Sequence, residues 1–365
     1  TMNAVKSLIL ITIVLVSCKK PVDDSTIDLP SNLTTTISTV EGLVTVEANA
    51  NATNFYTITF YDGSTAHPVE SNDGSATYTF SSSGTYTIIT KAHATYTDFI
   101  EKTETVNVAI TPIGAGGIPT SGYSTPLSYP GYTLVWNDEF TGTSLSADWI
   151  QEIGTGSSGW GNNELEYYRS ENTTVGEGVL TITAKEENYN GQNYTSSRIK
   201  TQGVRSFKYG RIDIRAALPY GKGLWPALWM LGDNITSVGW PACGEIDIME
   251  LVGGGTVNNR TVYGTIHWDD SGNHASYGGS KSLSTGTFAD EFHVFSITWD
   301  ASSINFLLDD VVYRTANLTP PELSEFHENF FFIFNVAVGG NWPGSPDGTT
   351  IFPQNMYVDY VRVFQ

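Results

Sequence analysis

Three carboxylates stand within six positions of one another in this 365-residue chain: Glu245, Asp247 and Glu250. Paired carboxylates on one surface suit the hydrolysis of a glycosidic bond, in which one attacks the anomeric carbon and the other protonates the leaving oxygen. The two groups must then differ in protonation at the same pH. Crowding produces this difference, because like charges a few ångströms apart cannot all ionise freely and their pKa values separate.

The residues between the carboxylates predict how the chain presents them. Apolar and acidic side chains alternate with a period of two from Glu245 to Ile248, which is typical of a β-strand with one buried face. Continued alternation would bury Glu250, which is costly for an unpaired carboxylate. A one-residue bulge near Met249 returns Glu250 to the acidic face. Because retention of configuration needs carboxyl groups about 5–5.5 Å apart, we expect a concave sheet, although a solvated acidic face or a calcium site would show the same spacing.

Tryptophans flank the acidic segment in sequence. Trp225 and Trp229 are four positions apart, which places them on one face of a strand, and Trp240 follows shortly before the acids. Aromatic faces stack on the apolar faces of pyranose rings, so we expect these three side chains to form sugar subsites. Core packing is the alternative for any tryptophan, and it suits Trp136 and Trp299 better.

The motifs around the acids resemble those of one enzyme family. Gly239-Trp240-Pro241, followed by Gly244-Glu245-Ile246-Asp247-Ile248-Met249-Glu250, is similar to the active-site strand of glycoside hydrolase family 16, above all its laminarinase (endo-β-1,3-glucanase) branch. The resemblance spans Tyr132 to Gln365 and includes Trp136-Asn137-Asp138-Glu139-Phe140, Gly161-Asn162-Asn163-Glu164, Ser197-Arg198-Ile199, Gly223-Leu224-Trp225-Pro226-Ala227-Leu228-Trp229-Met230, Thr265-Ile266-His267-Trp268, Asn335-Val336-Ala337-Val338-Gly339-Gly340 and Tyr357-Val358-Asp359-Tyr360-Val361. It implies that Glu245 is the nucleophile, Glu250 the acid/base catalyst and Asp247 the residue that tunes both.

Several polar residues are further candidates for contacts with sugar hydroxyls. His267 lies in a family-like segment, although a lone histidine on a strand is more often structural. Arg198 carries a fork of donors that suits adjacent hydroxyls, or else a carboxylate partner within the sheet. The other polar candidates are Asn162, Asn163, Glu164 and Asn335.

The same resemblance implies a structural calcium ion on the convex face. The sequence shows no EF-hand loop and no His/Cys cluster, so we expect no cofactor for catalysis. Family members often hold such an ion with an acidic residue early in the domain, a glycine carbonyl and a late aspartate. The matching positions are Glu139, Gly178 and Asp359. Oxygen ligands of this kind suit Ca²⁺, while solvated carboxylates are the alternative.

The charge balance narrows the class of partner. The chain carries 18 Lys and Arg against 38 Asp and Glu, a formal net charge of −20. This charge disfavours nucleic acids and anionic membrane surfaces, and it would repel sulfated polysaccharides such as carrageenan. The charge therefore indicates a neutral partner, and the family resemblance implies that this partner is a β-glucan. We also expect the protein to be a monomer.

The N-terminal segment predicts attachment to a membrane. Residues 1–17 resemble a bacterial lipoprotein signal peptide, whose apolar run from Leu8 to Val16 is too short to span a bilayer. Ser17 precedes Cys18 as in a lipobox, so we predict lipidation of Cys18, with ordinary signal cleavage as the alternative. Residues 18–28 form a polar tether. The predicted location is the bacterial cell envelope, with the lipid as the only membrane contact.

Two all-β domains are expected. Residues 29–110 hold short alternating segments bounded by turn residues, which predicts a small immunoglobulin-like sandwich. It resembles a PKD domain, and we favour a spacer role over sugar binding. Residues 111–130 are rich in Pro and Gly and predict a linker. Residues 131–365 hold strand-like runs without a long helical period, which predicts a catalytic β-jelly-roll sandwich.

These observations favour a retaining endo-glycosidase that hydrolyses internal β-1,3-glucosidic bonds of laminarin-type β-glucans by double displacement. A mixed-linkage β-1,3-1,4-glucanase is the alternative within the same class. A non-catalytic glucan-binding surface lipoprotein is less favoured, because it would need the tryptophans but not the three acids.

Overall fold

The computed structural model describes residues 12–13, 27–40, 42–80, 84–108, 117–254 and 258–365. The chain forms two compact units, Thr1–Pro112 and Ile113–Gln365, and each has an apolar core of its own. Both are built almost wholly of strands, which confirms the all-β prediction. Within the described residues, no helix has the length and apolar character needed to cross a membrane.

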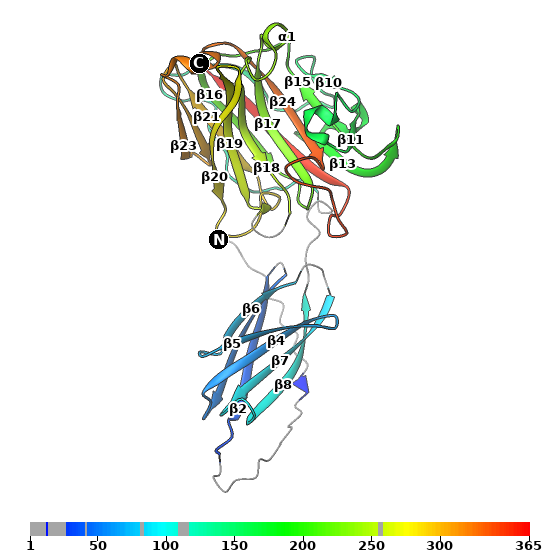
Figure 1. Ribbon diagram of the computed structural model, residues 1–365, viewed down its shortest axis with the longest axis vertical. Coiled ribbons are helices and arrows are strands. Elements are labelled where there is room, and N and C mark those ends of the chain that lie inside the picture. Colours follow the sequence, from blue (N-terminus) through cyan, green and yellow to red (C-terminus); the bar gives the residue numbers. More distant parts are fainter. Residues whose placement is uncertain (1–11, 14–26, 41, 81–83, 109–116, 255–257) are drawn as a thin grey trace. The chain divides into compact units, whose positions relative to one another are not determined.

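The N-terminal unit is a sandwich of two sheets with strand orders β1-β8-β7-β4-β5 and β2-β3-β6 (Figure 1). Its strands are β1 (Thr12–Ile13), β2 (Ser31–Val40), β3 (Leu43–Asn51), β4 (Phe55–Asp62), β5 (Thr65–Ser71), β6 (Ser75–Thr79), β7 (Gly84–His93) and β8 (Phe99–Val108). Alternation sets the faces: Val44 and Val46 of β3 are fully buried, whereas Glu47 points outward. They meet Phe60 of the other sheet in one core.

This sandwich has the predicted two-sheet architecture, while its PKD type and spacer role stay predictions. Cys18, the predicted lipidation site, lies outside the described residues, as do most of the predicted signal peptide and tether. Of the signal segment, Thr12 and Ile13 are described, and they pair with Glu104 and Thr103 of β8 at the edge of the sheet.

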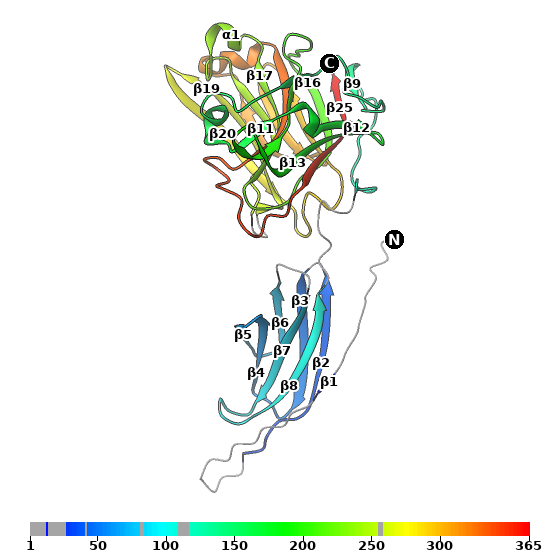
Figure 2. The ribbon, with the colours of Figure 1, turned by 90° about the vertical axis from the view of Figure 1, so that its right-hand side faces the viewer.

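The C-terminal unit is a larger, mostly antiparallel sandwich (Figures 1 and 2). Its seven-stranded sheet contains, in order, β10 (Ile150–Glu152), β15 (Arg198–Lys200), β24 (Phe330–Val338), β17 (Leu224–Gly232), β18 (Glu245–Leu251), β19 (Thr261–Asp270) and β20 (Asn273–Ser282). The ten-stranded sheet contains β11 (Glu166–Tyr168), β14 (Gln192–Ser196), β13 (Val179–Tyr189), β25 (Gln354–Phe364), β16 (Gly210–Ala217), β21 (His293–Trp299), β22 (Ser303–Leu308) and β23 (Val311–Asn317), with β12 (Thr173–Gly176) beside β13 and β9 (Leu134–Asp138) beside β25. Short helical segments are α1 (Ile235–Val238), η1 (Gly159–Asn163), η2 (Ser170–Asn172) and η3 (Pro321–His327). This is the predicted jelly-roll sandwich.

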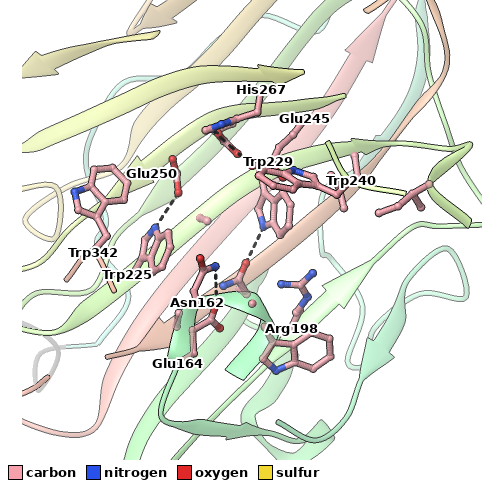
Figure 3. Close-up of a pocket in the computed structure, with 18 of the residues that line it drawn as sticks. Asn162, Glu164, Arg198, Trp225, Trp229, Trp240, Glu245, Glu250, His267 and Trp342 are labelled. Carbon is pink, nitrogen blue, oxygen red and sulfur yellow. Dashed lines mark hydrogen bonds and ion pairs between the residues drawn. The ribbon is translucent and has the colours of Figure 1, made fainter. Parts of the chain in front are cut away.

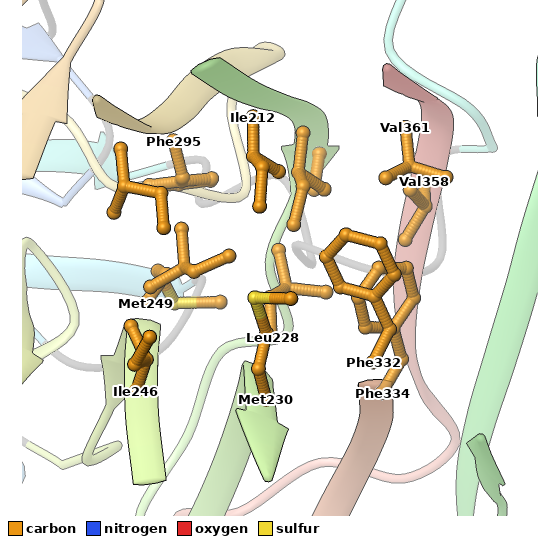
Figure 4. Close-up of a cluster of buried hydrophobic side chains, with 14 of the residues drawn as sticks. Ile212, Leu228, Met230, Ile246, Met249, Phe295, Phe332, Phe334, Val358 and Val361 are labelled. Carbon is orange, nitrogen blue, oxygen red and sulfur yellow. The ribbon is translucent and has the colours of Figure 1, made fainter. Parts of the chain in front are cut away.

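The facing surfaces of the two large sheets form the core (Figure 4). The seven-stranded sheet contributes Leu228, Met230, Ile246, Met249, Phe332 and Phe334, and the ten-stranded sheet contributes Ile212, Phe295, Val358 and Val361, all at most 2% exposed. Full burial of one such side chain stabilises the fold by roughly 1.5–3 kcal/mol. The core therefore fixes one face of β17, β18 and β24, and leaves their opposite face free for function.

The predicted linker, residues 111–130, is wrong in its second half. The Thr125 N–H donates a hydrogen bond to the Tyr360 hydroxyl at 2.8 Å, and the Tyr129 hydroxyl donates to Asp213 Oδ2 at 2.8 Å. These contacts fasten the segment to β25 and β16 of the larger unit. Composition alone suggested free chain, because Pro and Gly content does not record hydrogen bonds to residues far along the sequence.

Replacing Phe334 with alanine tests the core of the larger unit. The ring is fully buried and lies 4.9 Å from that of Trp149 and 5.9 Å from that of Phe332. We expect the free energy of unfolding to fall by about 3–5 kcal/mol, because truncation leaves a cavity. All nine tryptophans of the chain lie in this unit, so tryptophan fluorescence during urea denaturation reports its unfolding alone. The control is Val311→Ala at an exposed position, which should change the free energy of unfolding by no more than about 0.5 kcal/mol. A loss of less than about 1 kcal/mol for Phe334→Ala would contradict the packing described here.

Candidate active site

A bulge in β18 brings the three acids onto one face. Between Asp247 and Glu250, three steps along β18 match two steps along β19. The extra residue allows both Ile248 and Met249 to enter the core, where they are 1% and 0% exposed. Glu245, Asp247 and Glu250 all line one cleft on the outer face of the seven-stranded sheet (Figure 3). The predicted bulge is confirmed.

Glu245 lies at the N-terminal end of the acidic row. The indole Nε1 of Trp240 donates to its Oε2 at 3.0 Å, and His267 Nε2 lies 3.8 Å from its Oε1. Burial raises the pKa of Glu245 well above its ordinary value, and the charge of Asp247 raises it further, while His267 and Trp240 oppose the shift. His267 and Trp240 therefore stabilise the ionised form of Glu245.

Asp247 is the most buried of the three acids, at 3% exposure. Burial raises its pKa to about 8 against the effect of a hydrogen bond with Glu245. His267 Nε2 lies 3.0 Å from Asp247 Oδ2. Two hydrogen-bonded carboxyls with raised pKa values share a proton at neutral pH and titrate as a pair. The pair then carries one negative charge, and Glu245 is the nucleophile in the form in which the shared proton lies on Asp247.

Glu250, at the other end of the row, keeps its proton at neutral pH. Trp225 Nε1 donates to its Oε1 at 2.9 Å. Burial and then the charge of Asp247 raise the pKa of Glu250 to about 8, and the Trp225 bond only partly opposes them. A carboxyl with this pKa keeps its proton at neutral pH, as a general acid must. The row therefore combines a carboxylate suited to attack with a carboxylic acid suited to protonation.

The three predicted tryptophans line the same cleft (Figure 3). Trp225 and Trp229 extend from β17, and Trp240, which precedes β18, is 49% exposed. Each indole N–H is used within the protein; that of Trp229 donates to Asn335 Oδ1 at 2.8 Å. The rings are thus held in place by their nitrogen atoms and present aromatic surface to the cleft. Trp136 and Trp299 are buried, as predicted.

Asn162 and Asn335 form part of one cleft wall, and Asn335 lies across β17 from Glu250. Asn162 Nδ2 donates to Glu164 Oε1 at 3.2 Å, and Asn335 Nδ2 donates to the Tyr168 hydroxyl at 3.1 Å. That hydroxyl donates to Glu164 Oε2 at 2.9 Å. A continuous hydrogen-bond network thus runs from Trp229 to Asn162. Asn163 belongs instead to the exposed surface beside this wall.

Arg198 binds a carboxylate within the sheet, which is the second of the two alternatives given for it above. Its Nε donates to Glu152 Oε2 at 2.6 Å, and Lys200 Nζ binds the other oxygen of Glu152 at 2.6 Å. The guanidinium lies 4.7 Å from the ring centre of Trp160 and 4.9 Å from that of Trp229. Arg198 lines the cleft and supports two of its tryptophans through cation–π contacts.

Among the aromatic and histidine residues of the cleft, the sequence did not predict Trp160, His274 and Trp342. Trp342 is 45% exposed, and its ring lies 5.7 Å from that of Trp225. It stands in a Gly- and Pro-rich stretch shortly after Asn335, so an aromatic residue in a loop of that composition was the available signal. His274 carried no such signal; it becomes a cleft residue only because β20 pairs with β19.

The residues predicted for calcium are engaged elsewhere. Glu139 accepts two hydrogen bonds of 2.8 Å from Arg362, and Asp359 accepts one of 2.8 Å from Arg215. Gly178 has a positive φ of 79°, which favours glycine at the turn between β12 and β13. An ion would compete with both arginines for the two carboxylates, so calcium stays a prediction. Among the described residues, one group of His and acidic side chains lies close enough together to hold a metal ion. It consists of Glu245, Asp247 and His267.

Comparison with known proteins decides the family. Residues 161–362 match the family described as "Glycosyl hydrolases family 16". The chain belongs to glycoside hydrolase family 16. It is 43% identical over 249 residues to the "Beta-glucanase" of Rhodothermus marinus, with 65% of this chain and 86% of that protein covered. It is 44% identical over 239 residues to the "Clotting factor G alpha subunit" of Tachypleus tridentatus, with 65% of this chain covered but only 34% of that protein.

A solved structure agrees with this assignment. The laminarinase catalytic domain of Thermotoga maritima MSB8 is 46% identical, with a TM-score of 0.58, and the match covers 64% of this chain and 98% of that domain. The family 16 prediction and its laminarinase likeness are confirmed. The family match begins at residue 161, so it does not test the type of the N-terminal sandwich.

Alanine at Trp240 or Trp342 should weaken sugar binding without unfolding the enzyme. Both indoles are about half exposed, so little core is lost with either. We expect each change to cost on the order of 1 kcal/mol in oligosaccharide affinity, about fivefold in Kd. Calorimetric titration with a β-1,3-gluco-oligosaccharide, in a Glu245→Gln background to prevent cleavage, measures it. The control is Tyr132→Ala, which is also exposed but lies outside the cleft. If either tryptophan variant kept its affinity but lost much of its melting temperature, that tryptophan would be structural and would not bind sugar.

The pH profile should report the proton on Glu250. Because Glu250 must enter the reaction protonated, kcat/KM should fall as pH rises through about 8. Asp247 has a pKa of about 8 as well and is therefore partly ionised in this range, where its charge raises the pKa of Glu250. Asp247→Asn removes that charge and should move the basic limb to lower pH. Exchange of the exposed Glu47 for Gln, in the N-terminal unit, should leave the profile unchanged. A basic limb that stays in place in Asp247→Asn would show that the charge of Asp247 does not act on Glu250.

Proposed function

We propose that this chain hydrolyses internal β-1,3-glucosidic bonds of a laminarin-type β-glucan with retention of configuration. The observation that carries the proposal is the bulged row of acids, in which Glu245 and Glu250 face one cleft between exposed tryptophans. A matching laminarinase structure and the uncharged nature of β-glucan, which suits a chain of net charge −20, support the substrate class.

The reaction proceeds by double displacement. Glu245 attacks C1 of the bound glucosyl unit while Glu250 donates its proton to the glycosidic oxygen, which releases the first product and leaves a glycosyl ester on Glu245. Glu250, now ionised, takes a proton from water, whose oxygen attacks C1 and restores the free carboxylate of Glu245. Attack takes place in the state in which the proton shared by Glu245 and Asp247 lies on Asp247.

The tryptophans suggest how the polymer lies. Figure 3 shows Trp240 beside Glu245 at one end of the row, and Trp342 with Trp225 beside Glu250 at the other. Since Glu250 protonates the leaving oxygen, we place the departing part of the glucan on the Trp342 side. Stacking surfaces at both ends suit cleavage within a chain rather than at its terminus.

Two alternatives remain distinguishable. A mixed-linkage β-1,3-1,4-glucanase would use the same acids, and digestion of laminarin beside lichenan compares the two linkages directly. A non-catalytic glucan-binding protein would need no buried row of carboxyls with raised pKa values, so the cost of burying Asp247 and Glu250 argues for catalysis.

We further propose lipidation of Cys18, location at the bacterial cell envelope and a monomeric state. The signal-like sequence of residues 1–17 supports the first two. Mass spectrometry of the mature N-terminus from cell membranes would detect the acyl chains, and an unmodified N-terminus created by ordinary signal cleavage would exclude them. We also propose a structural Ca²⁺ at Glu139, Gly178 and Asp359. A chelator should then lower the melting temperature.

Glu245→Gln should abolish turnover and keep the fold. The amide preserves shape but cannot attack C1, so activity on laminarin should fall by a factor on the order of 10⁴ or more. Glu250→Ala should be nearly as inactive, but azide needs no general base and should restore reaction of a substrate with an activated leaving group, giving a β-glycosyl azide. More than about a tenth of wild-type activity in Glu245→Gln would exclude it as nucleophile, and an α-azide would indicate inversion.

A further inference from the structure

Three donor atoms of different residues converge at the nucleophile end of the cleft. His267 Nε2 lies 3.0 Å from Asp247 Oδ2 and 3.8 Å from Glu245 Oε1, and one atom of each residue lies within 4.8 Å of the others. Two ligands about 2.0–2.2 Å from one tetrahedral ion are roughly 3.4 Å apart. The separations from His267 Nε2, 3.0 and 3.8 Å, lie on either side of this value, so the three side chains are close to the spacing of metal ligands.

Asp247 adds an independent observation at the same group of side chains. Its side chain is 4% exposed and points into this group. Its Oδ2 is buried without a hydrogen bond of good geometry, although the imidazole of His267 is beside it. A buried carboxylate oxygen without a hydrogen-bond partner needs an explanation, and a cation bound by this oxygen and the ring nitrogen would supply one.

His274 supports the imidazole from behind. Its Nε2 lies 2.8 Å from His267 Nδ1, and the two rings are stacked with centres 5.0 Å apart. This contact occupies Nδ1 of His267 and leaves Nε2 as the ring nitrogen that faces the acids. Metal-binding histidines are commonly held by such a bond through their second nitrogen.

We propose that Glu245, Asp247 and His267 form a site for a transition-metal cation of the Zn²⁺ type, and that the bound ion inhibits the enzyme by occupying its nucleophile. One imidazole and two carboxylates are ligands that Zn²⁺ accepts, whereas Ca²⁺ and Mg²⁺ prefer oxygen alone. Three protein ligands leave a fourth position for water, on the cleft side where C1 of the sugar must arrive.

The ion and the glucan then exclude each other. A Glu245 oxygen bound to Zn²⁺ has no lone pair directed at C1, and a sugar seated over Glu245 fills the open position of the ion. Because coupling between two ligands is reciprocal, the glucan must weaken Zn²⁺ binding by the factor by which Zn²⁺ weakens glucan binding. Zn²⁺ should therefore raise KM for laminarin and leave kcat unchanged.

Calorimetric titration of the untagged full chain with ZnCl₂ tests the site directly. We expect one ion per chain, with binding lost in His267→Gln and in Glu245→Gln, and weakened about 10–100-fold in His274→Gln. His67→Gln, in the N-terminal unit, is the matched control and should bind as the wild type does. Co²⁺ as a second probe should give the visible absorption of a four-coordinate ion, which a β-1,3-gluco-oligosaccharide should abolish.

Two results would overturn the proposal. One is wild-type Zn²⁺ affinity in both His267→Gln and Glu245→Gln, each shown to be folded by its melting temperature, which would place any bound ion elsewhere. The other is Zn²⁺ binding that a saturating oligosaccharide leaves unchanged. Neither depends on turnover, so an enzyme that binds Zn²⁺ as expected but fails to cleave laminarin would contradict the proposed function and leave the metal site standing.

Discussion

The structure depends on one constraint within β18: seven residues must seal the core on one face and present three acids on the other. A regular strand cannot do both, because strict alternation would bury Glu250 beside Ile246 and Ile248 and turn Met249 toward the cleft. The bulge resolves the conflict by sending Ile248 and Met249 inward together. Catalysis and packing are thus satisfied by the same extra residue, and β17 and β19 must follow its twist on either side.

The cost of burying the acids is part of their chemistry. Asp247 and Glu250 are 3% and 9% exposed, and removal of water raises their pKa values before any neighbour acts. The same burial that makes the ionised row unfavourable gives Glu250 the proton it must donate. Because carboxyls with raised pKa values bind protons more tightly in the folded state, this row stabilises the fold most at acidic pH and progressively less as pH rises toward about 8.

The indoles join the acids to the cleft walls. Trp225 and Trp240 each use their N–H on a catalytic carboxyl and keep ring surface in the cleft, so an acid and its adjacent subsite move as one unit. The walls are joined in turn by backbone bonds between distant segments: Asn341 N–H donates to Asn162 C=O at 2.8 Å, beside Trp342. The cleft is therefore assembled from segments separated by nearly the length of the domain.

The sequence by itself determined the acidic row, its bulge and the all-β architecture, because each follows from alternation over a few neighbouring residues. It also indicated Trp225, Trp229 and Trp240 through their nearness to the acids. Only the tertiary structure decided that His274 supports His267, that Arg198 lies between Trp160 and Trp229, and that the second half of the predicted linker is fastened to β16 and β25. Those contacts join residues that strand pairing and sheet packing bring together, and no local period records them.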